Sequence, residues 1–371
     1  MKLRSRKIQT GSLNYDAEVS QVTQSTEEQM KIRKHIALFA GLGGFIAAAN
    51  RAGLQTVYAN DNNPHCYNTL KTTYPEIQIT NKSITELSAK TENAFQDEID
   101  VLSAGFPCQS FSAAGDNLGF EDPRGKLFFD IVRLCREAAS PPKILLLENV
   151  AYLKQFNNGS RLSIILQHLR AAGYWVSEKH AMVLNSKEIC GSPQNRERLY
   201  IVAYHSKFFK KNYFECVLQP EITETRLWDI INQKKKQDSR YYLEKESKYW
   251  DLVNDQVKIN GKKRLYQLRR TWVRTCPEGV CPTLTANMGG GGHNTPFVAD
   301  KYGIRKLTEE ECLALQGYDP GEVCFPSDAP TSVKYSMIGN AIYPKVAEMI
   351  FNRIDFSKIK KVKDDKLELS A

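Results

Sequence analysis

Short apolar segments alternate with helix-forming segments through the first half of the chain, and this rhythm restricts the fold more than any other feature. Continuous apolar runs that predict buried strands occur at residues 35–39, 54–59, 100–104, 143–147 and 199–203. Intervening segments such as 41–52 and 127–138 have the spacing of amphipathic helices. Strands alternating with helices predict an α/β fold, with a mostly parallel sheet and helices on both faces.

Further elements are expected outside this core. An extended strand is predicted over 174–184, and Thr308 is expected to cap a helix over 309–316. The string Met337-Ile338-Gly339-Asn340-Ala341-Ile342 is expected to begin a helix, with Pro344 in its first turns.

The turn after the first strand has the composition of a ligand-binding loop. Ala40-Gly41-Leu42-Gly43-Gly44 leads into a helix, where glycines admit a ligand close to the backbone and free N–H groups face it. Asp61 ends the second strand, where such folds place an acid for ribose hydroxyls. These features fit any nucleotide-binding unit, including a dehydrogenase, and Asp61 has a second interpretation as a turn or cap residue before Pro64.

Two reactive side chains follow later strands. Cys108 comes after the strand at 100–104 and the turn Gly105-Phe106-Pro107, which places a thiol at the edge where open α/β sheets bind ligands. Glu148 follows the strand at 143–147. A buried carboxylate needs a partner and has a raised pKa, although Glu148 has a second interpretation as a helix cap.

Five ordered strings resemble the motifs of the DNA (cytosine-5) methyltransferases of bacterial restriction-modification systems. They are Phe39-Ala-Gly-Leu-Gly-Gly44, Gly105-Phe-Pro-Cys-Gln-Ser-Phe-Ser112, Glu148-Asn149-Val150, Gln194-Asn-Arg-Glu-Arg198 and Met337–Ile342. The resemblance covers residues 35–355. It implies a Rossmann-like S-adenosylmethionine-dependent methyltransferase fold with a smaller DNA-recognition lobe. The expected division is a polar extension (1–34), a catalytic and cofactor-binding domain (35–204), a target-recognition domain (205–304), and a return to the catalytic domain with a tail (305–371).

The resemblance also implies roles for individual residues. Cys108 would be the nucleophile, Glu148 would bind the cytosine ring, Arg198 would contact the flipped base, and Arg196 would stabilise anionic groups of the site. The residues implied for S-adenosylmethionine are Phe39, Ala40, Gly41, Leu42, Gly43, Gly44, Asp61, Asn62, Ser83, Ile84, Gly105, Pro107, Leu127, Asn340 and Ala341. Asn62 and Ser83 depart from the aromatic and acidic residues that relatives often have there, which weakens the expected hold on adenine.

A basic segment lies beyond the α/β rhythm. Residues 258–274 contain seven lysines or arginines and no acidic residue, with Tyr266 and Trp272 between them, in a chain of formal net charge +9. Such a segment is either a solvated basic face or a surface for nucleic-acid phosphates. The expected DNA contacts are Arg124, Lys262, Lys263, Arg264, Arg269, Arg270 and Arg274.

Other function classes find little support. No apolar run reaches the length of a membrane span and the N-terminus lacks a signal-peptide core, so the cytoplasm is expected. Nine cysteines without a CxxC pair do not indicate disulfides, and the spacing of Cys276, Cys281 and His293 does not fit zinc, so no metal is expected. A monomer acting on double-stranded DNA beside a cognate restriction endonuclease is the main expectation. The alternatives are a transfer-RNA cytosine-5 methyltransferase and a non-catalytic DNA-binding protein.

Overall fold

The computed structural model describes residues 32–107, 123–222, 225–289 and 293–360. The chain divides into the units Met1–Arg33 and Lys34–Ala371, and nearly all of the described residues belong to the second unit. Among the described residues, no helix has both the length and the apolar character that a bilayer span requires.

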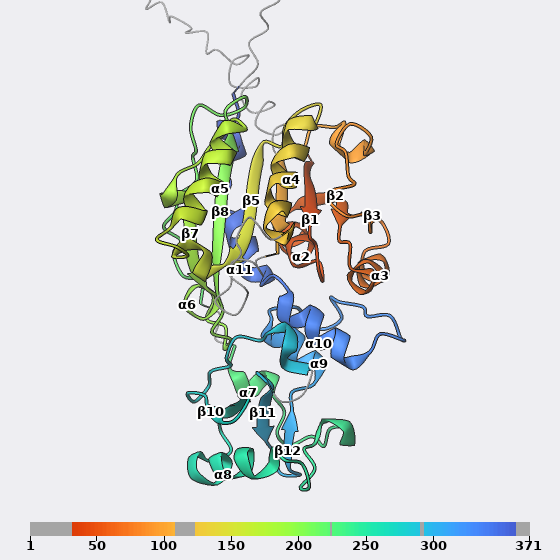
Figure 1. Ribbon diagram of the computed structural model, residues 1–371, viewed down its shortest axis with the longest axis vertical. Coiled ribbons are helices and arrows are strands. Elements are labelled where there is room, and N and C mark those ends of the chain that lie inside the picture. Colours follow the sequence, from red (N-terminus) through yellow and green to blue (C-terminus); the bar gives the residue numbers. More distant parts are fainter. Residues whose placement is uncertain (1–31, 108–122, 223–224, 290–292, 361–371) are drawn as a thin grey trace, which may run out of the picture. The chain divides into compact units, whose positions relative to one another are not determined.

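An eight-stranded sheet forms the core of the larger lobe (Figure 1). Its strands are β1 (Arg33–Leu38), β2 (Leu54–Asn60), β3 (Gln78–Thr80), β4 (Val101–Gly105), β5 (Ile144–Val150), β6 (Tyr174–Trp175), β7 (Ala181–Asn185) and β8 (Glu197–His205). Their order is β3-β2-β1-β4-β5-β8-β6, with β7 also paired to β8. β4 runs parallel to both β1 and β5, whereas β8 is antiparallel to β5, β6 and β7. The predicted mostly parallel sheet is confirmed.

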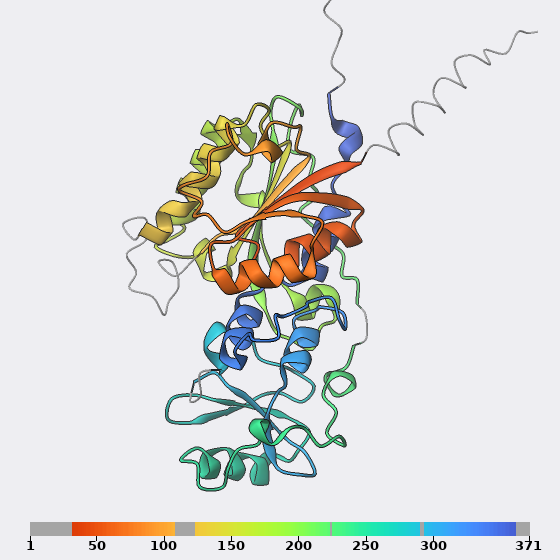
Figure 2. The same cartoon turned by 90° about the vertical axis from the view of Figure 1, so that its right-hand side faces the viewer.

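Helices cover both faces of this sheet, as Figure 2 also shows. Side chains of a strand point alternately to its two faces, so continuous apolar runs bury both. On β5, Leu145 and Leu147 pack with α4 (Pro123–Glu137) and α5 (Ser160–Ala171). Ile144 and Leu146 of the same strand pack on the opposite side with α2 (Gly44–Arg51), α6 (Ser186–Cys190) and α11 (Pro344–Phe351). α3 (Pro64–Thr73) packs beside Ala37 of β1 through its Leu70 side chain.

A smaller antiparallel sheet forms after residue 205, where the βα rhythm ends. Its strands are β9 (Leu265–Leu268), β10 (Val273–Thr275), β11 (Pro296–Ala299) and β12 (Ile304–Lys306), in the order β10-β9-β11-β12. Val253 of α8 (Trp250–Asn260) packs with Tyr266 and Phe297 of this sheet. α7 (Leu227–Ile230) precedes these elements in the chain and packs near α9 (Glu309–Leu315).

The chain then returns to the larger lobe through α9, α10 (Thr331–Asn340) and α11. Thr308 caps α9 as predicted: it accepts a hydrogen bond from the Glu311 N–H, and the Glu311 side chain accepts one from the Thr308 N–H. α11 packs against α2, so a helix near the end of the described residues lies against one near their beginning. Short 3-10 helices occupy Asn93–Phe95, Ala151–Lys154, Glu178–His180, Ser239–Tyr241, Ala286–Gly289 and Phe356–Lys358.

Two predicted elements are wrong in detail. The strand expected over 174–184 is interrupted, because the Ser177 N–H and the His180 ring bond to each other and turn the chain between β6 and β7. The string at Met337–Ile342 ends α10 instead of beginning a helix. Tyr343 is extended because it precedes a proline, and Pro344, which lacks an N–H, opens α11.

Candidate active site

The glycine turn after β1 leaves space for a ligand on one side and packs tightly on the other. Gly41 and Gly43 have φ angles of 58° and 83°, which favour glycine, and Phe39 shares this region with φ 52°. A Cβ added to Gly43 would lie 2.6 Å from the Tyr74 ring, whereas one added to Gly41 would have no neighbour within 4 Å. The turn therefore opens at Gly41, and only a residue without a side chain fits at Gly43.

Asp61 lies at the end of β2 beside this turn. Its carboxylate accepts hydrogen bonds from the Gly41 N–H (2.8 Å) and the Asn63 N–H (2.9 Å). Burial raises the pKa of Asp61, and these two bonds oppose the shift. The N-cap of α3 is Asn63, which accepts from the His65 and Cys66 N–H groups, so Asp61 is not the helix cap.

The segment after β3 carries Ser83 and Ile84, which are expected on the adenine side of the cofactor. Ile84 is buried, and the Ser83 hydroxyl lies 2.8 Å from the Thr85 hydroxyl. Asn62 is exposed, and Leu127 of α4 packs partly buried on the core cluster that contains Ile84. An open glycine turn, a carboxylate at the end of β2 and apolar side chains fit a nucleoside with a zwitterionic tail, as S-adenosylmethionine has.

Glu148 sits beside the strand that leads to Cys108. Gly105 of β4 is the register partner of Glu148 of β5, and a Cβ at Gly105 would lie 3.6 Å from a Glu148 carboxylate oxygen. The amide of Asn149 donates to the Phe106 carbonyl (3.1 Å) and so fixes the turn before Pro107. Cys108 itself lies outside the described residues. Asn149 had no role in the sequence analysis, although it belongs to the Glu-Asn-Val string.

An ion pair between buried Glu148 and half-buried Arg198 defines the electrostatics of this edge. Glu148 is 8% exposed, and its carboxylate lies 3.1 Å from Nε of Arg198. Burial raises the pKa of Glu148, whereas the charges of Arg198 and Arg196 lower it less, so the net shift is upward. The raised pKa predicted from its position is confirmed. Val150 pairs with Arg198 in the β5–β8 register, which explains why the two strings meet.

Arg196 has a different environment from Arg198. Its guanidinium is buried and donates to the carbonyls of Leu284 (3.0 Å), Gly339 (3.3 Å) and Ala341 (2.7 Å). Burial lowers its pKa to about 9, with a further contribution from Arg198. These partners are backbone carbonyls, so the bonds of Arg196 join β8 to two later segments of the chain.

The C-terminal string completes the site from a distant part of the sequence. Asn340 is exposed, whereas Ala341 is buried and its carbonyl accepts from Arg196 and from Gln316 (2.7 Å each). Ile342 reaches both functional turns: a Cβ at Gly44 would lie 2.8 Å from Ile342 Cβ, and one at Gly105 would lie 2.9 Å from its Cδ1. Ile342 was not among the predicted site residues, and its place next to Asn340-Ala341 is the only signal of its position in the sequence.

The expected DNA contacts that can be described lie on the β9–β10 hairpin and on the loop before β9. Lys262, Lys263, Arg270 and Arg274 are exposed and Arg269 is half-buried. Arg264 donates to the Cys276 carbonyl (3.2 Å). The Arg269 N–H bonds the Trp272 carbonyl (2.7 Å) and closes the β9–β10 hairpin, leaving the Trp272 side chain 55% exposed.

The remaining residues singled out in the sequence are Arg124 and the cysteines near residue 280. The side chain of Arg124 lies outside the described residues, although its backbone belongs to the first turn of α4. Cys276 and Cys281 are buried in one hydrophobic cluster with Leu284. Within the described ranges, no group of three or more histidine, cysteine or acidic side chains could hold a metal ion.

Comparison with known proteins agrees with this geometry. A family model for C-5 cytosine-specific DNA methylases matches residues 33–355. The type II methyltransferase M.Bsp6I of Bacillus sp. (strain RFL6) is 39% identical over 319 residues, which cover 85% of this chain and 96% of the relative. The type II methyltransferase M.HhaI of Haemophilus parahaemolyticus is 30% identical over 342 residues, 89% of this chain and 97% of the relative.

Solved structures show the same fold. The crystal structure of a Spodoptera frugiperda DNMT2 mutant superposes with a TM-score of 0.65 at 19% identity, covering 86% of this chain and 99% of that one. The Entamoeba histolytica methyltransferase EhMeth superposes with a TM-score of 0.67 at 15% identity, covering 87% and 98%. With the family match over nearly all of the described residues, this chain belongs to the C-5 cytosine-specific DNA methylase family.

Proposed function

We propose that this enzyme transfers a methyl group to carbon 5 of a flipped cytosine in a specific duplex DNA sequence, with Cys108 as nucleophile and Glu148 and Arg198 holding the ring. The buried Glu148–Arg198 pair carries this proposal, because it sits beside the strand that leads to Cys108. S-adenosylmethionine is the cofactor of this family, and when bound it supplies an electrophilic methyl group. Gly41, Asp61, Ile84 and Leu127 are the proposed residues that hold it.

The chemistry of cytosine explains why the reaction needs base extrusion and a thiolate. A base inside a duplex is out of reach, so it must be extruded at a cost of about a few kcal/mol. The Cys108 thiolate then bonds carbon 6, and the electron pair of the 5,6 double bond makes carbon 5 nucleophilic. After carbon 5 is methylated, loss of its proton and breaking of the bond from sulfur to carbon 6 release 5-methylcytosine and the free thiolate.

Glu148 and Arg198 would stabilise the ring during addition. A protonated Glu148 donates to the ring N3 as negative charge develops there, which its raised pKa favours. Its other oxygen accepts from the exocyclic amine, and Arg198 bonds the ring carbonyl oxygen. Arg196 would not contact the cytosine itself. Its bonds to the carbonyls of Leu284, Gly339 and Ala341 would keep the start of β8 and the C-terminal string in place around the ring.

Residues 205–304 are the proposed target-recognition domain, between the catalytic and cofactor-binding domain (35–204) and the returning segment (305–371). Support comes from the exposed cations of the β9–β10 hairpin and the adjoining loop, since phosphate contacts position a protein on duplex DNA. Trp272, exposed at the hairpin turn, adds an aromatic surface for bases.

We also propose that the enzyme protects DNA from a cognate restriction endonuclease and acts as a cytoplasmic monomer. The support for the protective role is that M.Bsp6I, M.HhaI and M.HpaII are type II methyltransferases. The names of these relatives also disfavour the transfer-RNA alternative. The non-catalytic alternative is less favoured because Glu148 and Arg198 are both in place.

The test is transfer of labelled methyl from S-adenosylmethionine to unmethylated plasmid DNA, followed by bisulfite sequencing. Marks at cytosines of one short sequence are expected. Cys108→Ala should bind DNA and cofactor but not turn over. Label in transfer RNA but not in DNA would refute the DNA substrate, and turnover by Cys108→Ala would refute the nucleophile.

A further inference from the structure

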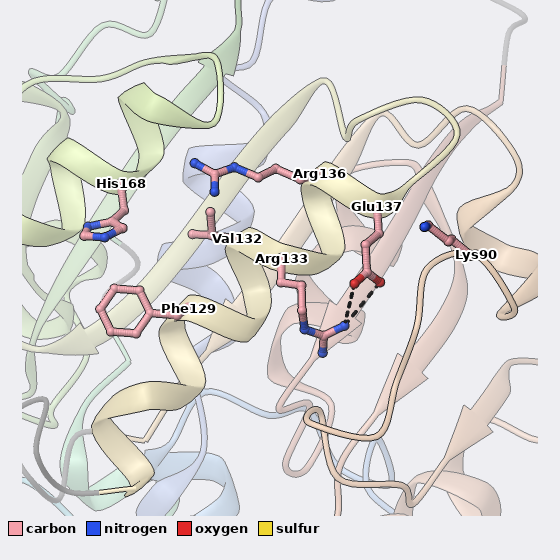
Figure 3. Close-up of a pocket in the computed structure, with 7 residues that line it drawn as sticks. All are labelled: Lys90, Phe129, Val132, Arg133, Arg136, Glu137 and His168. Carbon is pink, nitrogen blue, oxygen red and sulfur yellow. Dashed lines mark hydrogen bonds and ion pairs between the residues drawn. The ribbon is translucent and has the colours of Figure 1, made fainter.

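Two charged side chains of α4 connect this helix to an irregular segment at the adenine side of the proposed cofactor site. Arg133 and Glu137 are one helical turn apart and face each other across a hydrogen-bonded ion pair (Figure 3). They line a pocket of about 340 Å³ with Lys90, Phe129, Val132, Arg136 and His168. Along the edge of this pocket, Arg133 and Glu137 hydrogen-bond the segment after β3.

Arg133 bridges the helix to the backbone of this segment. Its Nη2 donates to the Ile84 carbonyl (2.9 Å), and its Nη1 donates to the Leu87 carbonyl (2.9 Å). Nε donates to Asp130 (3.0 Å), and Nη1 also lies 3.1 Å and 3.2 Å from the two Glu137 oxygens. The planar fork of arginine can make all these bonds at once, which a lysine ammonium cannot.

Glu137 extends the connection by two residues. One of its carboxylate oxygens accepts from the Ser88 hydroxyl and the Ala89 N–H, each at 3.2 Å. Burial raises the pKa of Glu137, but the bonds and charge of Arg133 outweigh burial and leave the pKa below its ordinary value. Glu137 therefore stays ionised at neutral pH, as the ion pair requires.

The segment needs this external support because it has little regular structure. β3 ends at Thr80 and the next helical turn begins at Asn93, with only turns between them. Ile84, Leu87 and Ala89 bury their side chains beside Ile131 and Val132 of α4. Apolar packing is non-directional, so hydrogen bonds set the position of the backbone. Arg133 and Glu137 supply those at Ile84, Leu87, Ser88 and the Ala89 N–H, and Gln96 donates to the Ala89 carbonyl (2.6 Å).

We infer that Arg133, held by Glu137, is a positioning residue that places the Ser83–Ala89 segment against the cofactor. The inference rests on the proposed cofactor role of Ile84 and on the expected place of Ser83 beside the adenine. Because Ser83 offers a weaker partner for the adenine amine than a carboxylate would, cofactor affinity depends on where the backbone holds Ile84. Arg133 touches no reacting atom, so it acts on cofactor binding and not on the chemical step.

The experiment compares Arg133→Gln, Arg133→Lys and Arg136→Gln in the full chain. Arg136 is a matched control, since it is an exposed arginine of the same helix and the same pocket. Calorimetry gives the Kd of S-adenosylmethionine, and steady-state kinetics give KM for cofactor, KM for DNA and kcat. Thermal melts monitor the fold.

Arg133→Gln is expected to raise the cofactor Kd and KM about tenfold or more, because charge-assisted bonds to two carbonyls are lost. At saturating cofactor, kcat and the KM for DNA should match those of the wild type. Arg133→Lys should have a cofactor Kd and KM between those of the wild type and Arg133→Gln. It keeps the charge beside Glu137 but cannot bridge both carbonyls. Arg136→Gln should match the wild type.

Wild-type cofactor affinity in a folded Arg133→Gln variant would overturn the inference, as would an equal effect of Arg136→Gln. A lower melting temperature and kcat with unchanged cofactor KM would show a merely structural role. If Arg133→Gln does not fold, Glu137→Gln serves instead and should raise the cofactor KM by a smaller factor; no change would overturn the inference. Failure of the wild type to bind S-adenosylmethionine would refute the proposed function itself.

Discussion

At the scale of single residues, burial shifts the pKa of some ionisable groups away from their ordinary values. Glu148 has a raised pKa and a cationic neighbour at 3.1 Å. His35 lies at the centre of the sheet, with its ring nitrogens 2.8 Å and 2.7 Å from the hydroxyls of Thr56 and Ser103. The proposed role of Glu148 is catalytic, so kinetics test it, whereas the buried bonds of His35 bear on stability, which unfolding experiments measure.

Glu148→Gln should lower kcat by a factor of about 10²–10⁴, the usual contribution of a general acid or base. Cofactor and DNA binding should persist, because the amide keeps the shape of the side chain. Single-turnover methylation with a fixed DNA duplex measures the effect. Glu197→Gln makes the same chemical change at an exposed neighbour and should be active. Near-normal turnover by Glu148→Gln would remove its assigned role.

His35 should make the fold less stable in mild acid. Burial lowers its pKa to about 3, so between pH 6.5 and 3 the unfolded chain binds a proton that the folded chain does not. The free energy of unfolding therefore falls as the pH drops below 6.5. From pH 7 to pH 5 this one group accounts for a loss of about 2 kcal/mol.

Urea unfolding of the wild type and His35→Gln at both pH values isolates that contribution, because the other histidines are common to the two proteins. The variant should lose about 2 kcal/mol less between pH 7 and pH 5. Parallel pH dependences in the two proteins would contradict the assignment to His35.

At the scale of elements, the β9–β10 hairpin is a small unit with an exposed cationic turn. Antiparallel pairing of Val273 with Leu268 and the bond from Arg269 to Trp272 hold the turn, while Arg270 and Arg274 face solvent. Its strands pack on Val253 of α8, so the turn projects from a supported base.

Replacing Arg270 and Arg274 with alanine should weaken DNA binding and reduce its salt dependence. Each lost phosphate contact should lower the slope of log K against log salt by about 0.9. Fluorescence anisotropy with a duplex over a range of NaCl concentrations gives this slope. Lys358→Ala removes an exposed cation outside the smaller sheet and should leave the slope unchanged. An unchanged slope in the double variant would exclude the hairpin from phosphate contact.

At the scale of the whole molecule, the two ends of the described chain depend on each other. α11 contributes Val346, Met349, Ile350 and Phe351 to the core cluster that contains Phe45 of α2 and Val101 of β4. Each such side chain contributes about 1.5–3 kcal/mol when buried. Their sum is comparable with the whole stability of a domain, about 5–15 kcal/mol.

A chain that stops at residue 340 should therefore fail to fold cooperatively, although it keeps every strand of both sheets. Loss of a sharp thermal transition in circular dichroism, and precipitation on expression, are the expected results. Supplying residues 341–371 as a second chain should restore soluble protein. A truncated chain with a sharp transition near the wild-type temperature would contradict this dependence.

The sequence alone determined the local features of this protein. Its buried strands at β1, β4 and β5, the glycine turn after β1, the capped helix α9 and the ordered family strings could all be read from neighbouring residues, because periodicity, capping and turn chemistry act over a few positions. The raised pKa of Glu148 also followed from its place at the end of an apolar strand.

Only the tertiary structure decided which distant residues meet. Arg198 reaches Glu148 because β8 pairs with β5. Ile342 reaches Gly44 and Gly105 because α10 and α11 return to the larger lobe. The bonds from Arg133 to the Ile84 and Leu87 carbonyls join two segments that are far apart in the sequence and share no sequence pattern. Such contacts depend on packing between elements and on backbone carbonyls. Because every residue carries a backbone carbonyl, the pattern of side chains along the chain does not predict which carbonyl is bonded.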